Sequence, residues 1–325
     1  MKYILKKTTV LLLLFISLFL LSSCTENNGN SKTEEEIDYS INMKTDFQIN
    51  DTLPEGENKK TKIIILLGQS NASGCSLVEY LKENSSKNDF ARYQNGYSNI
   101  LINYSIDNMH FTSNGEFKKT DLTCGCGNGF FGPEVGMADL LSKQYLDEKI
   151  FILKFTMSGY SLNHHWLNKR ARGDIYNACI KFLKVYLDYL LEKEYDATVD
   201  AICWMQGESD TTYEKANLYL DNQIAFVSYL REDLKEYQNE NGIYFIDAGI
   251  SSSPYCLPAY KEINNAKVEF SKLSPLNKYF STIDNGLTTL YEPSYEPDLG
   301  HYDALSEIKL GNLFAQEIIK IYNNN

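Results

Sequence analysis

The stretch KIIILLGQSNASG, residues 62–74, joins a short apolar run to a cluster of small polar side chains. Residues 63–67 are all Ile or Leu, which is typical of a strand that is covered on both faces of a parallel sheet. The run ends at Gly68, and Gln69, Ser70 and Asn71 follow it. This pattern indicates either an ordinary exit from a strand or a serine nucleophile held at the edge of a sheet.

Four further segments have strand character, and helical patterns lie between them. Strands are expected at 150–156, 201–205, 243–247 and 279–283, and helices from Pro133, from Asp174, over 213–238 and over 304–322. Strands that alternate with helices predict a parallel sheet with helices on both faces. In such a sheet ligands bind beyond the carboxyl ends of the strands. The polar clusters 68–71, 158–161 and 206–210 follow three of these strands, so we expect a site there.

The N-terminus has the pattern of a bacterial lipoprotein signal. Three lysines, Lys2, Lys6 and Lys7, precede an apolar run over residues 9–21, and Leu-Ser-Ser-Cys24 follows. We expect a signal peptide over 1–23, lipidation of Cys24, and a location in the bacterial cell envelope at the outer membrane. The alternative is a plain secretory signal with a chance cysteine. The polar stretch 24–60 is expected to be a flexible tether, and 61–325 to be the folded domain.

Composition excludes some partners and leaves others open. The net charge of −12 disfavours nucleic acid as a partner. Four scattered histidines offer no metal-ligand spacing, so we expect no metal and no cofactor. Disulfides are possible outside the cytoplasm, but the sequence does not determine their connectivity. Cys179 and Cys203 lie in apolar patterns and are expected to be buried thiols. The oligomeric state is undetermined.

A serine nucleophile needs a base, and histidine is the usual one. The chain has His110, His164, His165 and His301. Of these, His301 follows an aspartate at triad-like spacing, in Asp298-Leu-Gly-His301, in a turn just before the last helix. An Asp-x-x-His spacing is weak on its own, because Asp298 could simply structure the turn.

Five segments together resemble a known superfamily. They are GQSN (68–71), FGPE (131–134), WMQGESD (204–210), DLGH (298–301) and LGNLFA (310–315). In this order they are similar to the SGNH hydrolases, and more narrowly to the sialate O-acetylesterase and carbohydrate esterase family 6 branch. The resemblance covers about residues 60–323 and implies a flavodoxin-like, three-layer α/β/α sandwich with a central parallel sheet.

The resemblance also implies roles for individual residues. Ser70 would be the nucleophile, His301 the base and Asp298 its partner. The oxyanion hole would consist of the Ser70 and Gly159 backbone N–H groups and the Gln206 side-chain amide. Relatives of this branch often carry two glycines after the second strand, whereas this chain has Ser158-Gly159. That difference puts the Gly159 donor in question and would narrow the pocket.

Other polar and aromatic residues near these segments have less certain roles. Asn71, Tyr160 and Trp166 are possible substrate contacts, although Asn71 could brace the turn and Trp166 could be a structural aromatic residue. Glu208 is expected to be structural. Glu134, in the first turn of a helix, is expected to interact favourably with the helix dipole.

The resemblance implies a serine esterase that removes O-acetyl groups from carbohydrate by way of an acyl-enzyme. Two alternatives stay open at this point. One is a lipase or thioesterase on the same scaffold, and the other is a glycan-binding surface lipoprotein whose catalysis has decayed. Segments 75–130 and 251–295 are expected to form the walls of the site, and the sequence does not say which glycan they accept.

Overall fold

A mostly parallel β-sheet lies at the centre of the computed structural model, which describes residues 38–50, 53–289 and 298–324. Within these residues the sheet has eight strands in the order β12-β11-β10-β1-β7-β3-β4, and β5 pairs with β3. Pairing is parallel from β12 to β3, and β4 and β5 run antiparallel to β3. The strands are β1 (Lys60–Gly68), β3 (Tyr97–Ile106), β4 (Phe111–Thr112), β5 (Lys118–Thr120), β7 (Ile150–Thr156), β10 (Asp196–Met205), β11 (Tyr244–Ala248) and β12 (Asn277–Phe280).

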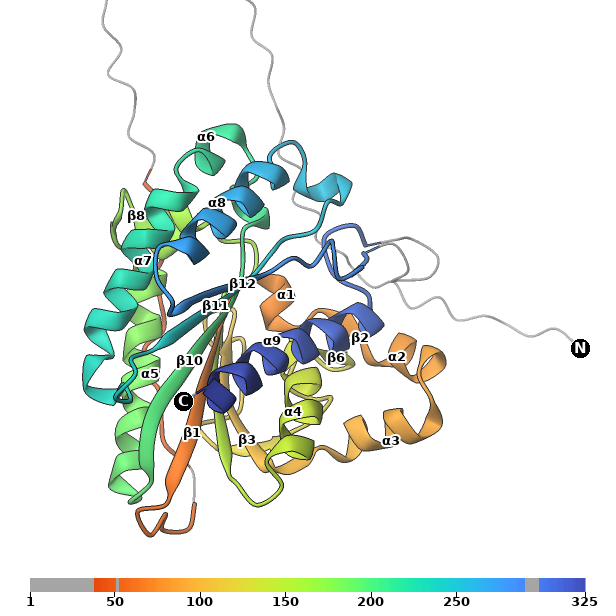
Figure 1. Ribbon diagram of the computed structural model, residues 1–325, viewed down its shortest axis with the longest axis vertical. Helices are drawn as coiled ribbons and strands as arrows, with labels where there is room; N and C mark the ends of the chain where they lie inside the picture. The colour runs from red at the N-terminus through yellow and green to blue at the C-terminus, as the bar shows by residue number, and fades with distance from the viewer. Residues whose placement is uncertain (1–37, 51–52, 290–297, 325) are drawn as a thin grey trace, which may run out of the picture. The chain divides into compact units, whose positions relative to one another are not determined.

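Helices cover both faces of this sheet. The longer ones are α2 (Val78–Asn84), α3 (Lys87–Asn95), α4 (Pro133–Gln144), α5 (Asp174–Glu192), α7 (Tyr219–Asp233), α8 (Tyr260–Lys272) and α9 (Ala304–Asn324). Figure 1 shows α5 and α7 on one side of the sheet and α4 and α9 on the other. The predicted three-layer α/β/α sandwich is therefore confirmed.

Strand β1 lies in the interior of the sheet, between β7 and β10. Its five residues 63–67 are 0% exposed, as their uninterrupted apolar run predicted. Strand β7 coincides with the predicted segment 150–156. Strand β3 was not predicted from the sequence, because buried polar residues such as Asn103 and Ser105 interrupt its apolar pattern.

Three parallel strands end at the same level of the sheet. In the register, Gly68 at the end of β1 pairs with Thr156 on β7 and with Met205 on β10. A Cβ atom at Gly68 would lie 2.0 Å from the Met205 carbonyl oxygen, so only glycine allows this close approach. Consequently the three polar clusters that follow these strands lie side by side, as expected.

Helices α4 and α9 pack against each other through close backbone contact. A Cβ at Gly136 would lie 2.1 Å from the Ile308 carbonyl oxygen, and one at Gly311 would lie 2.0 Å from the Pro133 carbonyl oxygen. The two glycines therefore allow the helix backbones to touch. The segment LGNLFA contains Gly311, so this contact shows that the segment contributes to helix packing and not to the chemistry of the site.

The folded unit begins earlier in the chain than the sequence indicated. It starts at Tyr39, and residues 39–50 are attached to the domain. The Ile41 N–H donates to Asp174 (2.8 Å), the Tyr186 hydroxyl donates to the Gln48 carbonyl (2.8 Å), and Phe47 packs edge-to-face on Phe182. The expected tether over 24–60 is therefore too long at its C-terminal end. The signal peptide and Cys24 lie outside the described residues.

No helix among the described residues is both long and apolar enough to cross a membrane.

Candidate active site

Ser70 is the first residue of the short helix α1 (Ser70–Ser73), directly beyond the end of β1. Its side chain is nearly buried, with the residue 8% exposed. A residue at the start of a helix has no partner within the helix for its backbone N–H. The serine hydroxyl and its own N–H are therefore presented at the same edge of the sheet.

His301 and Asp298 form a close pair in the turn before α9. His301 Nδ1 lies 2.6 Å from Asp298 Oδ2, and Asp298 Oδ1 accepts from the backbone N–H groups of Gly300 (2.9 Å) and His301 (3.2 Å). Burial alone would lower the pKa of His301, but the hydrogen bond and charge of Asp298 outweigh it and raise that pKa above its ordinary value. Burial likewise opposes ionisation of Asp298, but its bonds to His301 and the turn backbone hold its pKa below the usual range.

Asn71 connects the Ser70 segment to the His301 turn. Its Oδ1 accepts from the Tyr302 N–H (3.0 Å), and its Nδ2 donates to the Gly300 carbonyl (3.3 Å) and to Glu208 Oε1 (2.6 Å). Asn71 is 3% exposed, so its amide is committed to these bonds. These bonds brace the turn, and a direct contact of Asn71 with substrate stays a prediction.

The Ser70 and His301 side chains are not hydrogen-bonded to each other in the part of the chain that the structure describes. Such bonds are often long before substrate binds and shorten in the reacting complex. Asn71, next to Ser70, hydrogen-bonds to the backbone of both neighbours of His301, so the Ser70 segment and the His301 turn are in contact.

Glu208 is structural, as expected. It is buried and accepts the Asn71 amide. Burial raises its pKa above the ordinary value for a carboxyl group, and the Asn71 hydrogen bond opposes that shift. Glu208 and the Gly300 carbonyl thus both accept from Asn71 Nδ2, and together they fix the orientation of this amide.

Gly159 lies in an exposed turn shortly after the end of β7. It is exposed, its φ is +77°, and a Cβ on it would meet no atom within 4 Å. The preceding Ser158 is held by Asp107, which accepts from the Ser158 N–H (2.7 Å) and hydroxyl (3.1 Å). The Ser158 hydroxyl also lies 3.1 Å from Ser73 Oγ in α1. Ser158 thus connects the Gly159 turn to α1, and its effect on the width of the pocket stays a prediction.

Gln206 is held differently from the expected oxyanion donor. It is 0% exposed, and its Nε2 donates to Asp210 Oδ2 (2.7 Å) and to the Tyr160 carbonyl (3.3 Å). Its Oε1 accepts from the Tyr219 hydroxyl (2.9 Å). Both amide hydrogens are engaged, so an oxyanion role would require one of them to be released. That role stays a prediction.

Trp166 is not a sugar contact, which corrects one of the two interpretations above. It is 0% exposed and packs edge-to-face on Phe155, Trp204 and Phe226. The residue belongs to the core because α5 and α7 cover the segment η1 (Leu162–Trp166) that carries it. Tyr160 is half-buried and remains available as a contact.

The other histidines have different surroundings from His301. His164 stacks on Tyr39, with ring centroids 4.0 Å apart. His165 bonds to the Ser161 hydroxyl (2.9 Å), and burial together with the neighbouring His164 lowers its pKa to about 4. His165 is therefore neutral at ordinary pH, and neither residue is paired with a carboxylate as His301 is.

A buried ion pair that the sequence did not predict connects three segments near Ser70. Lys154 and Glu134 are both fully buried, and Lys154 Nζ lies 2.7 Å from Glu134 Oε2. Its other two bonds are to the carbonyls of Ser73 and Cys124, both at 2.9 Å. Lys154 thus ties α1, the loop at Cys124 and the start of α4 together. Glu134 therefore does more than interact with the helix dipole. The lysine within the otherwise apolar run 150–156 was the sequence feature that could have indicated this buried pair.

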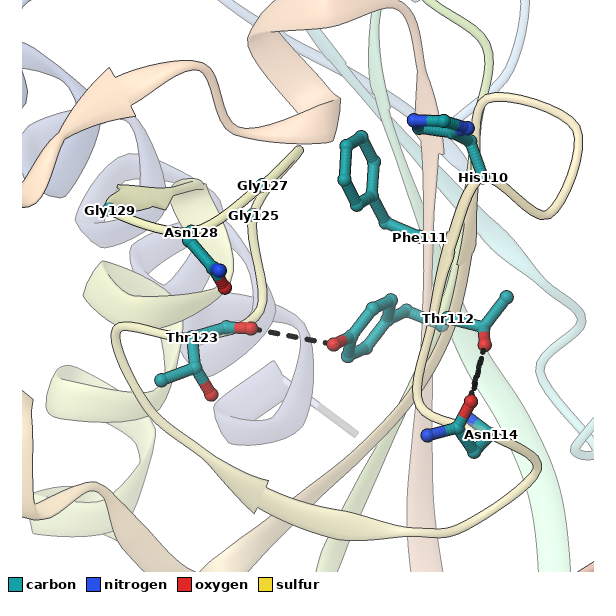
Figure 2. A pocket seen from close by; sticks show the side chains of 10 residues that line it. His110, Phe111, Thr112, Asn114, Thr123, Gly125, Gly127, Asn128 and Gly129 are labelled. Carbon is teal, nitrogen blue, oxygen red and sulfur yellow. Dashed lines mark hydrogen bonds between the residues drawn. The ribbon is translucent and has the colours of Figure 1, made fainter.

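A cavity of about 470 Å³ lies between the β3–β4 hairpin and the loop 123–129. Figure 2 shows His110 and Phe111 on one wall and Thr123, Gly125, Gly127 and Asn128 on the facing wall. Ser70, Gly159 and His301 do not line this cavity. Its two walls are hydrogen-bonded to segments of the candidate site, since Asp107 in the hairpin holds Ser158 and the Cys126 N–H donates to the Gly74 carbonyl at the end of α1. The lining contains rings, amides and hydroxyls but no aliphatic side chain.

The described residues contain no group of three His, Cys, Asp or Glu side chains placed to hold a metal ion. Cys179 and Cys203 are fully buried, as predicted.

Comparison with known proteins identifies the family. The family described as "Carbohydrate esterase, sialic acid-specific acetylesterase" matches residues 60–320. The chain belongs to this family. As a sialic acid-specific acetylesterase family member it is a carbohydrate esterase, and hence a carboxylic ester hydrolase, as the resemblance implied. No curated protein sequence matches the chain.

Solved structures share the fold of this carbohydrate esterase at low sequence identity. A protein from Arabidopsis thaliana is 19% identical over 82% of this chain and 99% of its own, with a TM-score of 0.60. NanS is 12% identical over 84% and 100%, with a TM-score of 0.54. A carbohydrate acetylesterase from Xanthomonas citri is 15% identical over 82% and 57%, with a TM-score of 0.55.

Proposed function

We propose that this carbohydrate O-acetylesterase acts through an acyl-enzyme on Ser70, with His301 as base and Asp298 as its orienting partner. The observation that carries the proposal is the Asp298–His301 pair, held against the Ser70 segment by Asn71. Since His301 Nδ1 bonds Asp298, Nε2 is the nitrogen left to accept the serine proton.

The reaction would proceed in two halves. Ser70 Oγ attacks the acetyl carbonyl carbon while His301 accepts its proton, and the resulting oxyanion is stabilised by the N–H groups of Ser70 and Gly159. The sugar oxygen then leaves with the proton from His301, and the acetyl group stays on Ser70. Water, activated by His301, attacks this ester, and acetate leaves as Ser70 recovers its proton.

The cavity beside the site would accept the sugar part of the substrate. Phe111 offers an aromatic face, and Asn114 and Asn128 offer amides that match sugar hydroxyls. A lining of this kind favours a carbohydrate over a long acyl chain. Acetylated polysaccharide and O-acetylated sialic acid both fit this chemistry.

The test is acetate release from a panel of acetylated polysaccharides and O-acetyl sialic acids. Wild type is compared with Ser70→Ala and with Ser98→Ala, which changes an exposed serine on β3. We expect Ser70→Ala to lose turnover and Ser98→Ala to keep it. Acetate release by Ser70→Ala at the wild-type rate would refute the proposed nucleophile.

The envelope location is also part of the proposal. The support is the sequence Leu21-Ser-Ser-Cys24 after an apolar run, which fits lipidation of Cys24. Metabolic labelling with a palmitate analogue in a bacterial host should mark wild type and not Cys24→Ala. Equal labelling of both, or of neither, would contradict the anchor.

A further inference from the structure

Two cysteine thiols meet at the end of the nucleophile helix. Cys75 follows α1, Cys126 lies in the loop 123–129, and their Sγ atoms are 2.8 Å apart. A thiol is a weak donor and a weak acceptor, so a hydrogen bond between the two thiols explains their short separation poorly. A bonded pair requires about 2.05 Å, which a small movement of the two side chains provides.

The backbone already holds the two segments together on both sides of this pair. The Cys126 N–H donates to the Gly74 carbonyl (3.0 Å), directly before Cys75. Directly after Cys75, β2 (Ser76–Leu77) pairs with β6 (Phe130–Phe131). Formation of a bond between the sulfurs therefore requires no rearrangement of the chain.

Electrostatics favours one of the two thiols as the reactive one. The Cys75 hydrogen bond and the charge of Lys154 lower the pKa of Cys126, and burial opposes them. The same hydrogen bond, together with burial, raises the pKa of Cys75. Cys126 is thus the more acidic thiol of the pair, and thiolates are the species that attack disulfides.

The other cysteines in the described residues have different environments. Cys124, Cys179, Cys203 and Cys256 are all 0% exposed, whereas Cys75 and Cys126 are both half-buried. Burial raises the pKa of the Cys124 thiol to about 12. An oxidant can therefore reach the Cys75–Cys126 pair most readily.

We propose that Cys75 and Cys126 form a disulfide that fastens the glycine-rich cavity wall to the nucleophile helix. The Cys126 thiolate attacks one sulfur of a disulfide oxidant such as oxidised glutathione, which forms a mixed disulfide and releases the first thiol. Cys75 then attacks the Cys126 sulfur and releases the second thiol. Two cysteine thiols become one disulfide, the oxidant gains two electrons, and both protons pass to its thiols.

The bond would close a loop between residues that are 51 positions apart. That loop contains β3 and the β3–β4 hairpin, and Cys126 lies between Gly125 and Gly127 of the cavity wall. Glycines allow the backbone of this wall many conformations, so a covalent link would reduce the number of conformations that it can adopt. This effect on the cavity rests on the proposed function, whereas formation of the bond does not.

Peptide mapping of the full chain tests the bond directly. The protein is incubated with oxidised glutathione, denatured, alkylated without reductant and cut with trypsin. We expect peptides 63–82 and 120–143 to be linked and to separate after reduction. Because Cys124 shares the second peptide, Cys126→Ser should abolish the link and Cys124→Ser should retain it. Alkylation of both Cys75 and Cys126 before reduction would overturn the proposal.

Thermal unfolding gives a second measurement that does not depend on catalysis. Reductant should lower the Tm of the oxidised wild type by several degrees and leave the Tm of Cys75→Ser/Cys126→Ser unchanged. An unchanged wild-type Tm on reduction would count against the bond. Acetate release is assayed on the same samples, so loss of activity with an intact link would contradict only the proposed catalytic function.

Discussion

Asn71 Oδ1 accepts a 3.0 Å hydrogen bond from the backbone N–H of Tyr302, so the residue after Ser70 holds the residue after His301. The same side chain donates to the Gly300 carbonyl. One buried amide therefore connects the two halves of the site, which are far apart in the sequence.

Replacing Asn71 by Ala should lower kcat much more than it changes KM. The variant leaves the His301 turn without its connection to α1, and a misplacement of about 1 Å costs roughly 100-fold in rate. Steady-state kinetics on an acetylated sugar, with circular dichroism to confirm folding, measures the effect. Asn84→Ala, at an exposed position in α2, is the control and should behave as wild type. A folded Asn71→Ala enzyme with wild-type kcat would contradict the bracing role.

The activity should rise with pH through the pKa of His301. His301 accepts a proton only when it is neutral, and Asp298 holds its pKa above the ordinary value. Asp298→Asn removes that charge, so the acid limb of kcat/KM should move to lower pH while the maximal rate falls by up to roughly 10⁴-fold. Asp147→Asn, at an exposed position, should leave the profile unchanged. An acid limb that does not move would argue against the Asp298–His301 pair as its origin.

Breaking the buried pair of Lys154 and Glu134 should be costly. Lys154→Met leaves a buried carboxylate without its partner, which is expected to lower the free energy of unfolding by about 3–5 kcal/mol. Urea unfolding measures the loss. The matched control is Lys272→Met, which removes an exposed pair with Glu269 and should cost less than about 1 kcal/mol. The double variant Lys154→Met/Glu134→Leu should recover much of the lost stability. If Lys154→Met costs no more than the control Lys272→Met, the buried pair does not contribute as expected.

The cavity wall should influence long substrates more than short ones. Phe111→Ala should lower kcat/KM for an acetylated oligosaccharide by roughly tenfold, about 1.4 kcal/mol of lost contact. It should change turnover of p-nitrophenyl acetate little, since that ester has no sugar to place in the cavity. Tyr213→Ala, which removes an aromatic side chain that is 55% exposed, is the control. Equal losses on both substrates would place Phe111 outside the sugar site.

The fold was predictable where the local pattern and the burial agreed. Strands β1 and β7 are apolar nearly throughout and buried on both faces, so their sequences alone predicted them. Strand β3 also lies between two partner strands, but its first half is partly exposed, and buried Asn103 and Ser105 interrupt the pattern that marks interior strands. The burial of those side chains depends on neighbouring helices and strands, which the local sequence of β3 does not reveal.

The site was predictable to the extent that its residues lie in short motifs. The Asp298–His301 contact joins residues three apart, and the sequence indicated it. The burial of Trp166 comes from helices later in the chain, and the Gln206 amide is held by Asp210 and a carbonyl of another loop. Lys154 was detectable in principle, because a lysine within a buried strand requires a partner.

The 231-residue separation of Asn71 and Tyr302 also has a consequence for biosynthesis. Ser70 leaves the ribosome early, whereas the His301 turn and helix α9 are made near the end of translation. Since the turn can dock on Asn71 only after both exist, the nascent chain lacks the proposed base, His301, until translation is nearly complete. Hydrolytic activity should therefore begin abruptly with the folding of α9, and partial translation products should not hydrolyse esters.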